Sequence, residues 1–91
     1  MKSKQDPRKQ FGNRLRKLRL DAGLSQEALA YAAELDRSYV GGVERGEYNI
    51  SLLNICALAR ALATPPYELL KFTDEPTDTA VKNAKNTKAK K

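Results

Sequence analysis

The sequence contains no histidine and only one cysteine, Cys56. One cysteine cannot form an internal disulfide, and without histidine the ligand set of a zinc finger and the commonest general base of enzymes are missing. We therefore expect a cytoplasmic protein that is no enzyme and that binds no metal or other cofactor. Cys56 is expected to be a small buried apolar residue, since no second cysteine accompanies it.

Long apolar runs are also absent. No stretch approaches the roughly 18 apolar residues that span a bilayer, and the polar start MKSKQDPRKQ lacks the apolar core of a signal peptide. A membrane is therefore not an expected partner. A chain of 91 residues corresponds to one small domain, and its 41% hydrophobic and 31% charged residues fall in the globular range.

Charge is distributed unevenly along the chain, whose net charge is +6. Residues 1–19 hold eight Lys or Arg and one acid, residues 20–73 hold four against seven acids, and residues 74–91 hold five against three. We predict a flexible basic N-terminus (1–7), a folded domain (8–73) and a disordered lysine-rich tail (74–91), since KNAKNTKAKK has no large apolar residue to bury. The tail either keeps the protein soluble or adds nonspecific affinity for phosphate.

Five short helices are predicted between residues 9 and 72, and no segment alternates like a strand, so the fold class is all-α. The first covers residues 8–22, closes at Gly23, and buries an apolar stripe of Phe11, Leu15, Leu18 and Ala22. The second begins after the N-cap Ser25 and runs to about Ala33, with Leu29, Ala30 and Ala33 on its inner face.

The third helix begins after Asp36, which is expected to cap it. Its inner face consists of Val40 and Val43, and its solvent face of Arg37, Ser38, Tyr39 and Gly42. Only residues 34–36 separate it from the second helix. Two helices joined by so short a turn, the second with a narrow inner face, are typical of a helix-turn-helix whose second helix enters a major groove of DNA.

Two more helices complete the prediction. Ser51 is expected to cap a fourth helix that supplies core residues Leu52, Ile55, Leu58, Ala59 and Leu62, and Thr64 to cap a fifth, PYELLKF. Tyr67, Leu69, Leu70 and Phe72 cannot all face inward from one short helix. We therefore expect these four residues to form the interface of a two-fold homodimer.

Residues 15–70 resemble the phage-repressor (Cro/XRE) helix-turn-helix family through GLSQEALA (23–30), VERG (43–46) and SLLNICALARAL (51–62). The segment LDRSYVGGVERG (35–46) looks most like the controller proteins of restriction-modification systems, although phage and plasmid regulators share much of it. The resemblance implies a compact lambda-repressor-like domain that binds a two-fold symmetric DNA operator as a homodimer and regulates transcription. RNA polymerase is a further candidate partner, and no small-molecule ligand is expected.

The sequence departs from the family pattern at two places. Glu34 stands in the turn where glycine or asparagine is usual, so we expect it to adopt a positive φ. Consecutive glycines, Gly41 and Gly42, lie in the recognition helix and cost about 1 kcal/mol each relative to alanine. Gly42 replaces a side chain that often reads bases, so direct reading is expected in the first turn, or the backbone approaches DNA closely.

The expected base-reading residues are therefore Arg37, Ser38 and Tyr39. Arg37 is the main reader, because a guanidinium can donate two hydrogen bonds to O6 and N7 of guanine. The alternative for Arg37 is a solvated cation that pairs with Asp36 or Glu34.

Other residues are expected to hold the DNA backbone. Gln26 leads this group, because its side chain and the free amides of a helix N-terminus both suit an anion. The set of expected phosphate contacts is Ser25, Gln26, Arg45, Tyr48, Asn49 and Ser51. Arg14 and Arg16 either join this set or are simply solvated.

The resemblance also implies a salt bridge between Arg19 and Glu44 that links the first helix to the end of the third; the alternative is two independent surface ions. A rival function keeps the same fold: an antitoxin-like module that binds a protein, with the lysine tail folding on that partner. The salt dependence and sequence preference of DNA binding distinguish the two functions.

Overall fold

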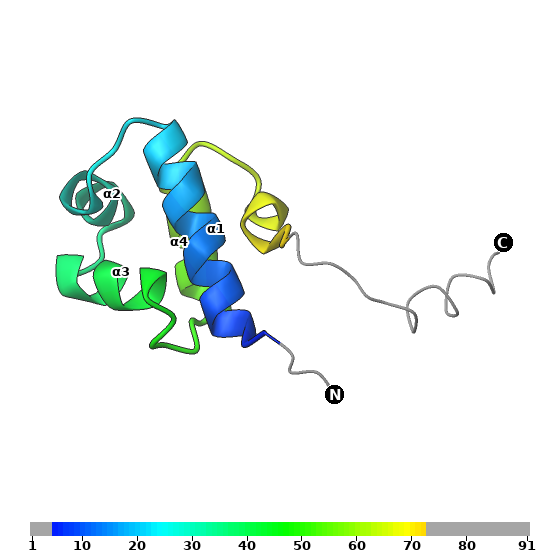
Figure 1. The fold of residues 1–91 in the computed structure, drawn as a ribbon. Coiled ribbons are helices and arrows are strands. Elements are labelled where there is room, and N and C mark those ends of the chain that lie inside the picture. Colours follow the sequence, from blue (N-terminus) through cyan, green and yellow to red (C-terminus); the bar gives the residue numbers. More distant parts are fainter. Residues whose placement is uncertain (1–4, 73–91) are drawn as a thin grey trace, which may run out of the picture.

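Residues 5–72 are described by a computed structural model in which all regular secondary structure of these residues is helical, as the sequence predicts (Figure 1). The elements are α1 (Pro7–Asp21), α2 (Gln26–Ala33), α3 (Arg37–Glu44), α4 (Leu52–Ala61) and η1 (Pro66–Leu70). The fifth element is a 3₁₀-helix and not the α-helix that we expected, because five residues that begin with proline offer few donors for α-type hydrogen bonds. The predicted tail (74–91) and most of the predicted N-terminal segment (1–7) lie outside the described residues.

The predicted caps are present at the starts of α2, α3 and α4. Ser25 accepts from the Ala28 amide, Asp36 from the Ser38 amide, and Ser51 from the Asn54 amide. These caps satisfy amide groups that have no partner within the helix. Sequence therefore determines where these three helices begin.

The observed start of α1 and the cap of η1 differ from those predicted, whereas α1 is closed by Gly23 as predicted. Asp6 caps α1 through the Arg8 amide, so the helix starts one residue earlier than predicted. Gly23 has a φ of 74° and closes α1 as expected, with the Leu24 amide bonded to the Arg19 carbonyl. Thr64 was wrong as the cap of the last element, because Pro65 occupies the N-cap and makes no side-chain bond.

Two residues other than glycine adopt a positive φ within residues 5–72. Glu34, in the turn between α2 and α3, has a φ of 60°, as we expected. Ala63 has a φ of 55° after α4, where the Thr64 amide returns to the Ala59 carbonyl. Nothing in the sequence marked Ala63 for this conformation, which usually requires glycine.

The core lies where the helices converge. Leu15, Leu29, Val40, Leu58 and Leu69 are each 0% exposed. Six of the predicted core residues are less buried than expected. Ala22 is exposed at the C-cap of α1 and Leu52 is exposed at the first position of α4. The other four are half-buried: Leu18, Ile55, Cys56 and Leu62.

Close packing of α1 against α3 depends on a glycine. A Cβ atom at Gly12 would lie 2.5 Å from the carbonyl oxygens of both Val43 and Glu44. The two helices can therefore approach only because position 12 has no side chain. This contact joins residues far apart in the chain, so no local sequence pattern predicts it.

Figure 1 shows α2 and α3 on one side of the α1 and α4 pair, and η1 on the other side of α1. Arg14 holds η1 against α1: its Nε donates to the Glu68 carbonyl at 2.7 Å, and its Nη2 to the Glu68 carboxylate at 2.8 Å. Arg14 thus joins α1 to η1, and neither of the roles that we considered for it, a phosphate contact or a solvated cation, describes it.

None of the helices in residues 5–72 is long and apolar enough to cross a membrane.

Candidate nucleic-acid interface

The turn between α2 and α3 has the geometry of a helix-turn-helix. The left-handed Glu34 lets the Leu35 amide reach back to the Ala30 carbonyl at 2.9 Å, which closes α2 and redirects the chain. Helix α3 then buries Val40 and Val43 against the rest of the domain. Its first turn is left open to solvent.

Arg37 is the first residue of α3 and is exposed. Within residues 5–72 it forms no ion pair with Asp36 or Glu34, the alternative partners that we considered. The Asp36 carboxylate instead accepts hydrogen bonds from the Ser38 amide and hydroxyl. These bonds lower the pKa of Asp36. The Arg37 guanidinium therefore retains its donors for an external acceptor.

The other two expected base-reading residues are more constrained. The Ser38 hydroxyl donates to Asp36, although its oxygen can still accept. Tyr39 was expected to face solvent, but it is half-buried: its hydroxyl accepts from Asn54 Nδ2 at 3.1 Å, and its ring centroid lies 5.0 Å from that of Tyr48. Contacts with α4 and the preceding loop thus fix the Tyr39 ring.

Gly42 was also expected on the solvent face, and this was wrong because the loop after α3 covers it. A Cβ atom at this position would lie 3.0 Å from Tyr48 Cδ2 and 3.2 Å from Glu47 Oε1. Gly42 is therefore buried. The missing side chain makes room for Tyr48, and it does not bring the α3 backbone to the surface.

A buried ion pair joins Arg19 of α1 to Glu44 at the end of α3. Arg19 Nε and Nη2 donate to the two carboxylate oxygens at 2.6 and 3.0 Å, and each residue is only 7% exposed. This hydrogen-bonded pairing raises the pKa of Arg19. Arg19 Nη1 also donates to the Leu24 carbonyl at 2.9 Å.

Gln26 extends this network to α2. Its side-chain amide donates to Glu44 Oε1 at 3.0 Å, so the start of α2 is tied to the end of α3. An amide nitrogen carries two hydrogens, and the second can still serve an external oxygen. The structure thus places Gln26 at the N-terminus of α2 with part of its hydrogen-bonding capacity used internally.

Arg45 is the C-cap residue that follows α3, and it pairs with an acidic residue that we did not expect to take part in the site. Its Nε donates to Glu47 Oε2 at 2.8 Å and its Nη2 to Oε1 at 3.2 Å. The pairing lowers the pKa of Glu47 and raises that of Arg45. Gly46, with a φ of 81°, turns the chain between the two residues. The sequence Arg-Gly-Glu, in which a glycine separates opposite charges, was the pattern from which this pair could have been predicted.

The remaining expected phosphate contacts lie on the surface. Ser25, Tyr48, Asn49 and Ser51 are all exposed. The hydroxyls of Ser25 and Ser51 cap α2 and α4, so each stands beside free amides at a helix N-terminus. Such amides suit an anion such as a DNA phosphate.

The expected dimer residues do not share one exposed face. Leu69 is 0% exposed and packs in the core, so its assignment to the interface was wrong; a buried side chain cannot contact another copy. Phe72 is half-buried, whereas Tyr67 is 62% and Leu70 50% exposed. The structure adds three exposed leucines that we did not expect, Leu20, Leu52 and Leu53.

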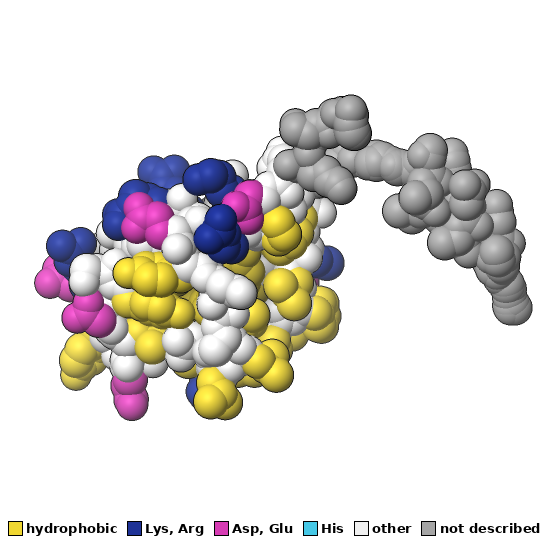
Figure 2. Space-filling view, turned by 90° about the horizontal axis from the view of Figure 1, so that it is seen from below, with side chains coloured by type: hydrophobic (Ala, Val, Ile, Leu, Met, Phe, Trp, Pro, Cys, Tyr) yellow, Lys and Arg dark blue, Asp and Glu magenta, His cyan; other side chains and the backbone are white. Residues whose placement is uncertain are grey.

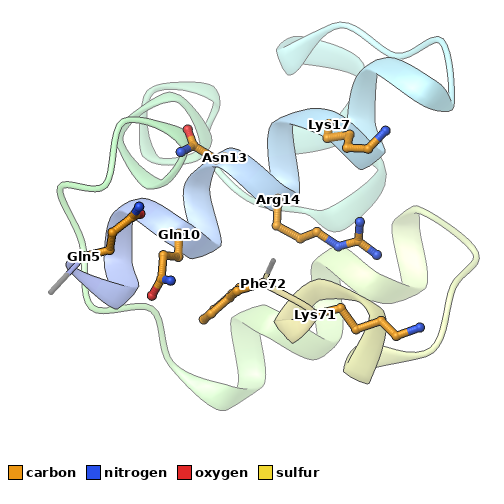
Figure 3. Close-up of a pocket in the computed structure, with 7 residues that line it drawn as sticks. All are labelled: Gln5, Gln10, Asn13, Arg14, Lys17, Lys71 and Phe72. Atoms are coloured by element: carbon orange, nitrogen blue, oxygen red, sulfur yellow. The ribbon is translucent and has the colours of Figure 1, made fainter. Parts of the chain in front are cut away.

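The space-filling view from below shows apolar patches together with a band where acidic side chains lie among the basic ones (Figure 2). A shallow hollow of about 350 Å³ lies elsewhere, between α1 and the end of the described chain (Figure 3). Its cations are engaged: Arg14 and Lys71 pair with Glu68, and Lys17 with Asp21. Within residues 5–72 no three potential metal ligands gather.

An open first turn on a buried, braced helix, with helix N-termini available to anions, defines a DNA-binding domain of the helix-turn-helix class. Comparison with known proteins supports this class. Residues 10–72 match the family described as "Helix-turn-helix domain". The chain is 44% identical to the control protein C.BamHI of Bacillus amyloliquefaciens over 64 residues, which cover 69% of this chain and 79% of that protein.

Solved structures agree. The restriction-modification controller protein C.AhdI from Aeromonas hydrophila is 61% identical, with a TM-score of 0.67, and the match covers 68% of this chain and 94% of that one. The hypothetical transcription factor NHTF from Neisseria is 41% identical, with a TM-score of 0.72, and the match covers 80% of this chain and 84% of that one. The chain therefore belongs to the helix-turn-helix family of Cro/XRE type, in the group that contains the restriction-modification control proteins. It is a DNA-binding transcription regulator.

Proposed function

We propose that the protein binds a two-fold symmetric operator as a homodimer and controls transcription in the cytoplasm as a restriction-modification controller protein does. The observation that carries this proposal is the free, exposed Arg37 guanidinium at the start of a recognition helix that is braced from behind. One α3 helix can contact only a few base pairs. Two copies place their helices in successive major grooves, about 34 Å apart, and so add specificity.

In this proposal Arg37 reads a guanine, while Ser38 and Tyr39 supply weaker contacts from the same turn. Ser25, Gln26, Arg45, Tyr48, Asn49 and Ser51 hold the backbone. Phosphate contacts fix the orientation of the helix and carry no sequence information, whereas base contacts select the site. The Arg19–Glu44–Gln26 network supports this division, because it joins the phosphate-binding end of α2 to the end of the reading helix.

The homodimer is proposed to use the exposed apolar side chains of Tyr67 and Leu70, with Leu52 and Leu53 as further candidates. Contiguous apolar patches on the surface of a small domain commonly mark a site that a partner buries. Binding over a promoter would repress transcription. Binding beside one would activate it if the dimer contacts RNA polymerase, which is our proposed second partner in that case.

The test is selection of bound sequences from a random duplex pool, followed by binding measurements on the selected site. We expect an approximate inverted repeat and a steep fall of affinity with salt. Arg37→Ala should cost about 1 to 3 kcal/mol on that site and relax one position in each half, whereas Gln26→Ala should weaken all duplexes alike. Recovery of no preferred sequence would refute the proposal and favour a protein-binding module.

A further inference from the structure

The loop after α3 places a carboxylate in the middle of a proposed phosphate-binding surface. Glu47 makes two hydrogen bonds to Arg45, and both side chains are more than half exposed. Lys9, on the first turn of α1, lies against Gly46 and donates to the Arg45 carbonyl at 3.4 Å. The hydrogen bonds from Arg45 lower the pKa of Glu47, and the charges of Arg45 and Lys9 lower it further.

We propose that Glu47 holds Arg45 in the free protein in place of a DNA phosphate, and thereby limits the affinity of the domain for DNA of any sequence. The inference rests on the proposed function, and in particular on Arg45 as a phosphate contact. Among the ion pairs of residues 5–72, the Arg45–Glu47 pair is the one that contains a proposed phosphate-binding residue.

The chemistry of the guanidinium supports this exchange. Its planar array of donors matches a carboxylate and a phosphate equally well, so the two oxyanions compete for the same face. When DNA arrives, Arg45 either leaves Glu47 or is shared with it. In both cases the hydrogen bonds to Glu47 are given up or divided before a phosphate can use the guanidinium, and this cost does not depend on base sequence.

The turn at Gly46 and the absence of a side chain at Gly42 allow Glu47 to lie beside Arg45. Gly46 turns the chain by its positive φ, and Glu47 Oε1 lies over the side-chain-free position of Gly42, next to the ring of Tyr48. Glu47 therefore stands over α3 itself.

The experiment compares Glu47→Gln with the full-length wild-type protein on the selected operator and on a random duplex, at several salt concentrations. The amide keeps the shape of the side chain and removes its charge. We expect tighter binding to both duplexes, by roughly eightfold per protomer at 0.1 M salt, and a slope of log K against log salt that steepens by about 0.9 per protomer. Asp21→Asn is the matched control, since it removes an acid from the exposed Lys17–Asp21 pair at the far end of α1, and it should change affinity less than twofold.

An Arg45→Ala background tests whether Glu47 acts through Arg45. In that background the increase in DNA affinity caused by Glu47→Gln should fall to about the small change expected for Asp21→Asn. Weaker or unchanged binding by Glu47→Gln, or a gain no larger than that of Asp21→Asn, would overturn the inference. Its outcome is separable from that of the proposed function, because the effect is measurable on random duplex even if no operator is found.

Discussion

Gly12 of α1 lies so close to the backbone of Glu44 that a Cβ atom there would be 2.5 Å from the Glu44 carbonyl oxygen. The obstacle is backbone, which cannot rotate away as a side chain can. This contact sets the distance between α1 and the end of α3. It therefore sets how the reading helix is seated on the domain.

Gly12→Ala should lower the free energy of unfolding by about 1 to 3 kcal/mol, because the overpacking outweighs the better helix propensity of alanine. Gly41→Ala is the matched control: its nearest neighbours are the ends of the Arg45 and Gln26 side chains, at 3.3 and 3.4 Å. It should gain about 0.5 to 1 kcal/mol. Urea unfolding of both variants checks the pair, and equal shifts would contradict the close approach.

The ion pair of Arg19 and Glu44 gives a second prediction. Glu44→Gln should cost about 3 to 5 kcal/mol, since it leaves the buried Arg19 cation without its carboxylate. The double variant Arg19→Met with Glu44→Leu should regain much of this loss, because no unpaired charge remains. Thermal unfolding followed by circular dichroism measures both proteins. A double variant no more stable than Glu44→Gln would show that burial of the charge is not the cause.

Substitution of the two non-glycine residues with positive φ, Glu34 and Ala63, is expected to stabilise the domain. Glu34→Gly and Ala63→Gly should each raise the free energy of unfolding by a few tenths to about 1 kcal/mol, because glycine adopts positive φ without the clash of a Cβ atom. Ala32→Gly, at an exposed position in the last turn of α2, should instead lower the free energy of unfolding by about 0.5 to 1 kcal/mol. If all three variants lose stability in denaturant melts, strain at 34 and 63 is unimportant.

The proposed dimer is tested by Leu70→Asp, which should sediment as a monomer at micromolar concentration while the wild-type chain sediments as a dimer. The charge would be forced into an apolar interface with no partner. Leu20→Asp is the control, because Leu20 is 51% exposed on α1 and Leu70 is 50% exposed on η1. A dimeric Leu70→Asp variant would place the interface elsewhere, with Leu52 and Leu53 the next residues to change.

Local chemistry explains which parts of the fold could be predicted. The caps Ser25, Asp36 and Ser51 act on amides two or three residues away, so sequence alone identified the starts of three helices. Glu34 was recognised as strained because the turn position requires a left-handed residue. Each of these features depends on neighbours in the chain.

Contacts between distant residues account for what was missed. Arg14 reaches Glu68 across 54 positions of sequence, and no local pattern distinguishes it from the exposed Arg16. Leu69 and Leu70 are adjacent and chemically identical, and only packing decides that the first is buried and the second exposed. The cover that Tyr48 forms over Gly42 likewise depends on how the loop folds back on α3.

That cover has a consequence for how binding preference can change over evolutionary time. The proposed DNA-binding surface is composite: α3 supplies Arg37 at one end, and an irregular loop supplies the aromatic ring of Tyr48 where the helix has no side chain at Gly42. Loops tolerate substitution and insertion better than packed helices. New operator preferences can therefore arise by altering the loop while the hydrophobic scaffold stays intact.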